Sequence, residues 1–213
     1  MTERLLKIFG EIPEGKIFAD VACDHGYIAK AMISAGKCEK VYISDISEKS
    51  LEKARTLLKE YIESGKAESF VSDGFAAVPP CDVALVAGIG GALTVNILKS
   101  APFLPDKLVL SPMRNLKEVR KTLIRKGYKI LKDFTVFADG EYYEIIVSEK
   151  GKDELSKDEE EFGRTNLEEL PQAFKDKMRI EYGKLISYSE REGISEKAKR
   201  QLQKKAERYL KYV

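Results

Sequence analysis

The sequence predicts an α/β fold in which a mostly parallel, doubly wound sheet ends in an antiparallel hairpin and is followed by a helical hairpin. Three observations predict it. Short apolar runs alternate with segments of helical periodicity as far as Gly127. Asp139 and Gly140 then separate two consecutive strand-like runs, which is typical of a β-hairpin. After Gly151 no strand pattern recurs, so we expect two domains, residues 1–150 and residues 151–213.

The elements of the first domain follow from local signals. An amphipathic helix is expected to end at Gly10 and to cover one edge of a site, and Asp45–Ser47 is expected to cap a later helix. Gly36 and Gly65 are stop signals for helices. Strands are expected at residues 16–21, 40–44, 68–72, 83–86 and 107–110, and helices at residues 28–35, 51–61, 92–99 and 119–124.

The last third of the chain is expected to contain a β-hairpin, then an acidic connector, and then two helices. The hairpin should comprise residues 128–136 and 142–148, which places a reversed strand at the edge of the sheet. An acidic connector at residues 153–161 is then expected to lead into two amphipathic helices, which span residues 167–186 and 195–212 and are joined by a turn at Gly193.

Composition limits the classes of protein that fit. A chain of 213 residues can bury a core without disulfide bonds or a structural metal, and a net charge of +2 neither demands nor excludes a polyanionic partner. The three cysteines, Cys23, Cys38 and Cys81, lack CxxC spacing and accompany a single histidine, so we expect reduced thiols and no metal site. Because no apolar stretch is long enough to span a membrane, we expect a cytoplasmic protein that does not bind membranes.

The stretch from Phe18 to Met32 predicts a binding site. Its short apolar run breaks into a small, polar turn and then restarts with helical spacing, which indicates strand, turn and helix. The unpaired N–H groups at such a helix N-terminus favour a ligand with a carboxylate or phosphate. Asp45 closes the next strand about 20 residues further on, where nucleotide-binding α/β folds place a carboxylate on ribose hydroxyls. Asp20 and Asp45 could also be simple caps at strand ends.

Six motifs resemble one family specifically. In order along the chain they are DVACDHGYIAKAM, YISDIS, VSDGF, ALVAGIGG, LVLSPMRNLKEVRKTLIRKGY and GEYYEIIVSEKG, and they are similar to the TrmK family of bacterial tRNA (adenine-22-N1)-methyltransferases. The resemblance covers nearly all of the first 150 residues. It implies a Rossmann-like class I S-adenosylmethionine-dependent methyltransferase that methylates N1 of an adenine in tRNA, with a C-terminal coiled-coil appendage.

The resemblance implies a cofactor site at the first turn and the strand ends. Asp45 should accept the ribose hydroxyls, and Asp73 with Gly74 should meet the adenine. Two glycines that are usual in the first turn are absent. The expected cofactor-binding residues are Asp20, Ala22, Cys23, Asp24, Gly26, Tyr27, Asp45, Ile46, Asp73, Gly74, Ala87, Gly88 and Gly90.

The expected catalytic residues are Asp24 and Asn115. Asp24 could stabilise the charge that develops on the methylated base or take a proton from N6. The glycine-rich turn at residues 87–91 replaces the Asn/Asp-Pro-Pro-aromatic clamp of exocyclic-amine methylases, which favours a ring nitrogen as the target. Ser111 stands where the family often has glutamine. The residues expected to bind substrate are His25, Pro112, Arg114, Lys204 and Lys205.

We expect basic side chains to form the surface that contacts tRNA phosphates. These side chains concentrate on the last helix and on Lys117, Arg120, Lys121, Arg125 and Lys126. We expect the protein to be a monomer or a weak dimer. Alternatives stay open: the tail could be a solvated helix face or a dimer contact, and His25 could be a packed or capping residue. A methyltransferase for a protein or small molecule, or a non-catalytic cofactor-binding protein, would share the same first domain.

Overall fold

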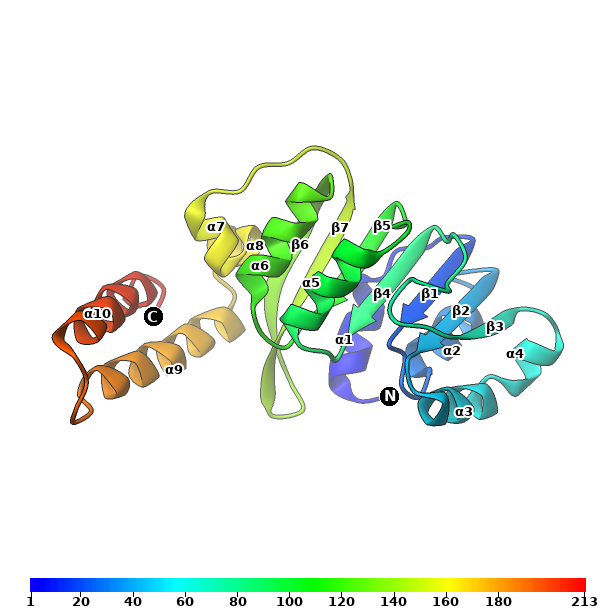
Figure 1. Ribbon diagram of the computed structural model, residues 1–213, viewed down its shortest axis with the longest axis horizontal. Helices are drawn as coiled ribbons and strands as arrows, with labels where there is room; N and C mark the ends of the chain where they lie inside the picture. Colours follow the sequence, from blue (N-terminus) through cyan, green and yellow to red (C-terminus); the bar gives the residue numbers. More distant parts are fainter.

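A seven-stranded sheet with strand order β3-β2-β1-β4-β5-β7-β6 runs through the computed structural model, which describes residues 1–213 (Figure 1). β3, β2, β1, β4 and β5 pair in parallel, whereas β7 is antiparallel to both β5 and β6. The strands are β1 Ile17–Val21, β2 Lys40–Asp45, β3 Ala67–Val71, β4 Val83–Ala87, β5 Lys107–Ser111, β6 Tyr128–Ala138 and β7 Glu141–Lys150. The predicted fold class is confirmed, but β6 and not the reversed strand β7 forms the edge.

Helices cover both faces of the sheet. α1, α2 and α3 pack on one face and α5 and α6 on the other, so that successive residues of a strand alternate between two cores. In β4, for example, Val83 and Leu85 belong to the first core and Ala84 and Val86 to the second. These helices are α1 Glu3–Glu11, α2 Tyr27–Ser34, α3 Glu48–Leu57, α4 Lys59–Glu63, α5 Gly91–Ser100 and α6 Leu116–Arg125.

Two helix predictions need correction in this half. α1 continues past Gly10 to Glu11, and the helix expected at residues 51–61 is divided into α3 and α4 at Leu58. Leu58 is fully buried in the core that α2 and α3 share. α4 has no fully buried residue, although Tyr61 and Ile62 still pack against this core.

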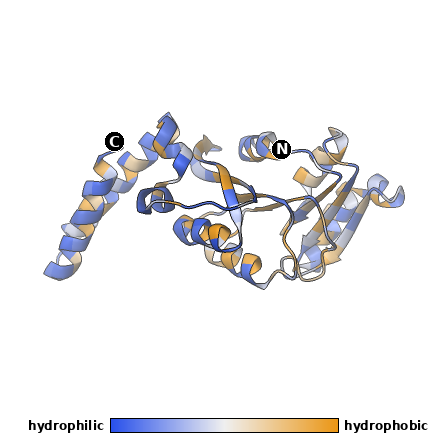
Figure 2. Cartoon of the chain, turned by 90° about the horizontal axis from the view of Figure 1, so that it is seen from above, coloured by the Kyte–Doolittle hydropathy of each residue, from blue (hydrophilic) through white to orange (hydrophobic).

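The C-terminal segment is more structured than predicted. Residues 153–161 are not a simple connector, because a capping box between Ser156 and Glu159 starts α7 there. The helix expected at residues 167–186 is interrupted at Leu170 and Pro171, since proline cannot continue a helix interior. The elements are α7 Lys157–Phe162, α8 Arg164–Glu169, α9 Gln172–Ser189 and α10 Glu196–Leu210, and the largely hydrophilic α9–α10 hairpin extends away from the sheet (Figures 1 and 2).

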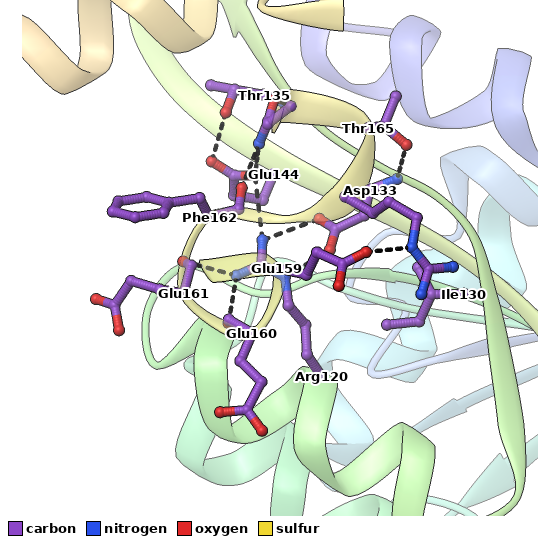
Figure 3. A network of polar contacts seen from close by, with 12 residues as sticks. Arg120, Ile130, Asp133, Thr135, Glu144, Glu159, Glu160, Glu161, Phe162 and Thr165 are labelled. Carbon is purple, nitrogen blue, oxygen red and sulfur yellow. Dashed lines mark hydrogen bonds and ion pairs between the residues drawn. The ribbon is translucent and has the colours of Figure 1, made fainter. Parts of the chain in front are cut away.

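A buried arginine joins α7 to the sheet (Figure 3). The side chain of Arg120 is 1% exposed, and its Nη2 donates to Oδ1 of Asp133 on β6 at 2.9 Å. Its Nη1 donates to the backbone carbonyls of Glu160 and Glu161 at 3.1 and 3.0 Å. Arg120 therefore belongs to the interior and not, as its sequence position suggested, to a basic surface.

Glu144 of β7 completes this cluster. One of its carboxylate oxygens accepts from Thr135 Oγ1 at 2.7 Å and Lys177 Nζ at 2.6 Å, and the other lies 3.8 Å from Arg120 Nη2. Asn166 of α8 donates to Glu144 and accepts the N–H of Thr135 at 2.8 Å. The cluster thus attaches α7, α8 and α9 to the outer hairpin of the sheet.

No helix of the structure is both long enough and apolar enough to cross a bilayer.

The Arg120 cluster makes a stability prediction. Arg120→Met leaves the buried carboxylate of Asp133 without its close cation, and removal of one partner from a buried pair costs about 3–5 kcal/mol. We expect the free energy of unfolding in urea to fall by that amount. The matched control is Arg125→Met, an exposed position on the same helix, which should change stability by less than about 0.5 kcal/mol. Equal effects of the two substitutions would contradict this account.

Candidate functional site

A cavity of about 550 Å³ opens at the carboxyl ends of β1, β2 and β4. This volume is in the range of small-molecule sites, about 300–1,000 Å³. Strand order reverses beside β1, and such a switch point is where open α/β sheets bind ligands. The predicted site residues that line it are Asp20, Ala22, Cys23, Asp24, His25, Tyr27, Asp45, Ile46, Asp73, Gly74, Ala87 and Gly88.

The turn after β1 has an unusual backbone. Ala22 and Asp24 have φ values of 59° and 48°, in the left-handed region where glycine is normally found, so these two side chains occupy the positions of the absent glycines. Gly26 has φ 71° and starts α2. A Cβ on Gly26 would lie 3.1 Å from Cβ of Ala54, so this glycine allows α2 to approach α3 and does not line the cavity.

Asp20 is buried beneath this turn, with 6% of its surface exposed. Its Oδ2 accepts the N–H of Ala29 at 3.2 Å, which satisfies a free donor in the first turn of α2. Burial raises the pKa of Asp20 to about 7, and the nearby charge of Asp45 adds to the rise. Burial likewise raises the pKa of the Cys23 thiol, so this cavity-lining side chain stays neutral.

Asp45 holds the turn from the end of β2. Its Oδ2 accepts the N–H of Asp24 at 3.2 Å, and its Oδ1 accepts the N–H of Ser47 at 2.9 Å. A carboxylate offers about four lone-pair positions, so two remain for a ligand in the cavity. Asp45 is therefore a structural cap whose geometry also suits a diol.

Asp24, His25 and Tyr27 form the rim of the cavity. The Nε2 of His25 lies 3.5 Å from Oδ2 of Asp24, and the two side chains are 39% and 63% exposed. The His25 ring stacks on Tyr27 with centroids 5.4 Å apart. The rim thus combines a carboxylate with two stacked rings that solvent can reach.

The β5–α6 loop lies beside the opposite rim. The N–H of Met113 donates to the carbonyl of Ile89 at 3.0 Å, and Ile89 lines the cavity. A Cβ on Gly91 would lie 1.9 Å from the carbonyl oxygen of Arg114, so only glycine permits this loop to pack on the start of α5. Pro112, Arg114, Asn115 and Gly90 were predicted as site residues; they do not line the cavity, and their roles stay predictions.

At the end near β3, Ser72 shapes the turn that carries Asp73 and Gly74. The hydroxyl of Ser72 donates to the carbonyl of Gly74 at 2.9 Å. Gly74 has φ 59°, and a Cβ there would lie 2.8 Å from Cγ2 of Ile97, so the backbone lies against an apolar side chain of the cavity.

Sequence reasoning missed several lining residues. Arg4 and Leu5 come from α1, which was expected only to cover one edge of a site, and Ser50, Leu93 and Ile97 come from helices without a predicted site residue. The other missed residues lie inside the quoted motifs, but no local pattern shows which of their side chains face the cavity. The full set that was missed is Arg4, Leu5, Ile28, Ser50, Ser72, Leu85, Ile89, Leu93 and Ile97.

Lys204 and Lys205 lie outside the cavity. They are exposed on α10, which Figure 1 shows at the far end of the molecule from α2 and α3. Lys205 Nζ lies 5.5 Å from the centroid of the Tyr209 ring. The structure contains no group of three or more His, Cys, Asp or Glu side chains arranged to hold a metal ion.

The fold and the cavity agree with a family model. Residues 1–146 match the model described as "Methyltransferase domain", which is more than half of the chain. The chain therefore belongs to this methyltransferase-domain family.

Two curated relatives are similar to this chain over 64% and 71% of its length. A Mycoplasma genitalium protein, provisionally named as a tRNA methyltransferase, is 30% identical over 142 residues, or 64% of this chain and 63% of that protein. The tRNA (adenine(22)-N(1))-methyltransferase of Bacillus subtilis is 26% identical over 160 residues, or 71% of this chain and 66% of that protein. The matched region thus spans just under two thirds of each relative.

Solved structures match over the whole chain. Streptococcus pneumoniae Sp1610, provisionally described as a tRNA (m1A22) methyltransferase, has a TM-score of 0.92 at 23% identity, with 100% of this chain and 99% of that chain covered. M. capricolum TrmK, in complex with the cofactor product S-adenosyl-homocysteine, has a TM-score of 0.87 at 21% identity, with 100% and 97% covered. These structures show that the chain has their fold over its whole length, and the name of the Bacillus subtilis relative agrees with the resemblance to the TrmK family that the motifs carry.

Asp20 predicts a pH dependence of stability. The folded state keeps this proton up to a pH near 7, whereas the ordinary pKa of an Asp side chain is 3.8. The free energy of unfolding should therefore fall as pH rises from about 4 to about 7, by at most about 1.4 kcal/mol per pH unit. Asp20→Asn can still accept the Ala29 N–H but cannot ionise, so urea unfolding at several pH values should show it gaining stability relative to wild type across this window. Parallel pH profiles for the two proteins would contradict the burial argument.

Proposed function

We propose that the protein transfers a methyl group from S-adenosylmethionine to N1 of adenine 22 in a tRNA. The observation that carries this proposal is the cavity at the ends of β1, β2 and β4, where four carboxylates and a strained turn meet. The names of the Bacillus subtilis relative and of M. capricolum TrmK support the reaction and the cofactor. A cytoplasmic location and a monomer or weak dimer belong to the same proposal.

The cavity residues fit this cofactor. Asp45 would accept the two ribose hydroxyls with its remaining lone pairs, and the backbone of Asp73 and Gly74 would meet the adenine beside Ile97. Ionised carboxylates favour the cationic sulfonium and ammonium groups. Asp20 would face the cofactor from beneath the first turn. Gly88 has no side chain, so the backbone at the end of β4 stays accessible to the cofactor.

When bound, the cofactor supplies a methyl group on a sulfonium. N1 of adenine already has a lone pair, so the residues of the chain mainly need to align the two reactants. Asp24 would hold its exposed carboxylate where positive charge appears on the base, or accept the proton lost from N6. The stacked pair His25 and Tyr27 would provide a flat apolar surface for that base.

The tail supports tRNA over a protein or small molecule as substrate. α10 contains six Lys and Arg side chains, and Lys204 and Lys205 among them are exposed. Of the second predicted basic cluster, Arg120 is buried and Lys117 lies 3.6 Å from a carboxylate oxygen of Glu161. Phosphate contacts are therefore assigned mainly to α10.

Methyl transfer can be tested directly. Purified protein would be incubated with labelled S-adenosylmethionine and unmodified tRNA, and the modified base would be mapped by mass spectrometry. We expect one methyl group on N1 of adenine 22, and none on the same tRNA with guanine at that position. Label on another atom or base would revise the proposal, and saturable cofactor binding without label in any tRNA would favour a different substrate.

A substitution at Asp24 is expected to lower turnover much more than it lowers the affinity for cofactor. Asp24→Asn keeps the side-chain shape and tolerates the left-handed backbone, but it removes the negative charge. We expect kcat to fall about 10- to 100-fold, while the Kd for cofactor changes less than about threefold. Titration calorimetry and single-turnover methylation measure the two quantities. A loss of affinity as large as the loss of turnover would make Asp24 a binding residue only.

Lys204 and Lys205 predict salt-dependent binding. The double substitution Lys204→Ala and Lys205→Ala should weaken tRNA binding and flatten the plot of log Kd against log salt by about 1 to 2, because each phosphate contact contributes about 0.7 to 0.9. Cofactor affinity should not change. Lys59→Ala with Lys66→Ala, around α4 at the other end of the molecule, is the matched control. An unchanged salt slope would exclude this part of α10 from the tRNA contact.

A further inference from the structure

We propose that Arg4 of the N-terminal helix binds the carboxylate of the amino-acid portion of the methyl donor, and that Asp139 in the distant β6–β7 turn positions it. This inference deepens the proposed function and rests on it. It assigns a binding role to Arg4 and a positioning role to Asp139, both of which lie outside the six motifs.

The charges that line the cavity are unbalanced without Arg4. Among the 21 residues lining the cavity, Asp24, Asp45 and Asp73 are aspartates besides the buried Asp20, which keeps its proton up to a pH near 7, and Arg4 is the single Lys or Arg. The donor carries a sulfonium and an ammonium group, which suit the aspartates, but its carboxylate would be repelled by them. A guanidinium is the side chain best shaped to bind a carboxylate through paired hydrogen bonds.

Strand order places Arg4 at the correct end of the cavity. If the ribose binds at Asp45 after β2 and the adenine at Asp73 after β3, the amino-acid end must extend the other way along the edge β3-β2-β1-β4. Arg4 lies there, because its Nη2 is 3.4 Å from the point where a Cβ on Gly88, after β4, would be. The small Gly88 leaves this approach open.

The Arg4 side chain is held but its donors are unused. Its guanidinium lies over the ring of Tyr143, with Cζ 5.1 Å from the ring centroid. The hydrogen bonds and ion pairs of the structure include none from this guanidinium to a protein group, so its N–H groups are available to a ligand.

Asp139 holds the first turn of α1, whose N-cap residue is Thr2. Its two carboxylate oxygens accept the N–H groups of Glu3 and Arg4, each at 3.1 Å, and its own N–H donates to Oε2 of Glu3 at 3.4 Å. Figure 1 shows the start of α1 close to the turn of this hairpin. A carboxylate at a helix N-terminus is stabilising, and here it connects two segments 135 residues apart in sequence.

The test compares two ligands on the full chain by titration calorimetry. S-adenosylmethionine and decarboxylated S-adenosylmethionine differ only in the carboxylate, so their ratio of Kd values reports its binding. Wild type should prefer the complete donor, and Arg4→Gln should weaken its binding about 10- to 100-fold while leaving the decarboxylated ligand within about twofold. Lys7→Gln removes a cation from the same helix outside the cavity and should change neither Kd.

Each outcome separates this inference from the proposed function. If wild type binds neither ligand, the cofactor assignment itself fails. If wild type binds the donor and Arg4→Gln weakens both ligands equally, Arg4 supports the fold and the inference is wrong. If Arg4→Gln leaves the Kd values of both ligands unchanged but weakens tRNA binding, the guanidinium binds an RNA phosphate. That result would also overturn the inference.

Asp139 is tested as a positioning residue. Asp139→Asn retains a residue that tolerates φ 49° but leaves only one acceptor for the two N–H groups. We expect a smaller loss of affinity for the complete donor, confined to that ligand. In the double variant with Arg4→Gln, this loss should disappear, because Asp139 acts only through Arg4. Additive losses would show that Asp139 acts independently, which contradicts the positioning role.

Discussion

The parallel pairing of β1 with strands on both sides is the constraint on which the site depends. Val21 is in register with Ser44 of β2 and with Val86 of β4, so the three strands finish at the same edge of the sheet. The residues at their ends, among them Asp24, Asp45 and Gly88, therefore line one cavity. The chain leaves the end of β1 through a sharp turn, in which Ala22 and Asp24 have left-handed backbone conformations.

That turn is strained, and the acids around it offset the cost. Each left-handed residue other than glycine costs about 1–2 kcal/mol. Asp45 accepts the N–H of Asp24, and Asp20 accepts that of Ala29, so both ends of the turn are held by side chains from strand ends. The alternatives of structural cap and ligand-binding residue are therefore compatible for these two aspartates, since a carboxylate has enough lone pairs for both.

Two distant polar contacts connect the rest of the chain to this sheet. Arg120 fastens α7 to the outer hairpin through Asp133, and Asp139 at the turn of the same hairpin fastens the start of α1. The outer hairpin thus contacts both the C-terminal helices and the N-terminal helix. On one side it carries the basic helix proposed to contact RNA, and on the other it holds Arg4 at the cavity.

Local sequence was sufficient for the alternating strands and helices, the edge hairpin and most of the cavity, because periodicity, Asp-Gly turns and strand-end acids act over a few residues. It failed where the deciding contact is remote. Arg120 looked like a surface cation and is buried because Asp133 and Glu144 surround it, and the acidic connector contains a helix that packs on the same cluster. Arg4 lines the cavity from a helix whose first turn also donates to Asp139, a residue 135 positions away. Tertiary packing decides such placements, since a charged side chain has no local signal that distinguishes solvent from a buried partner.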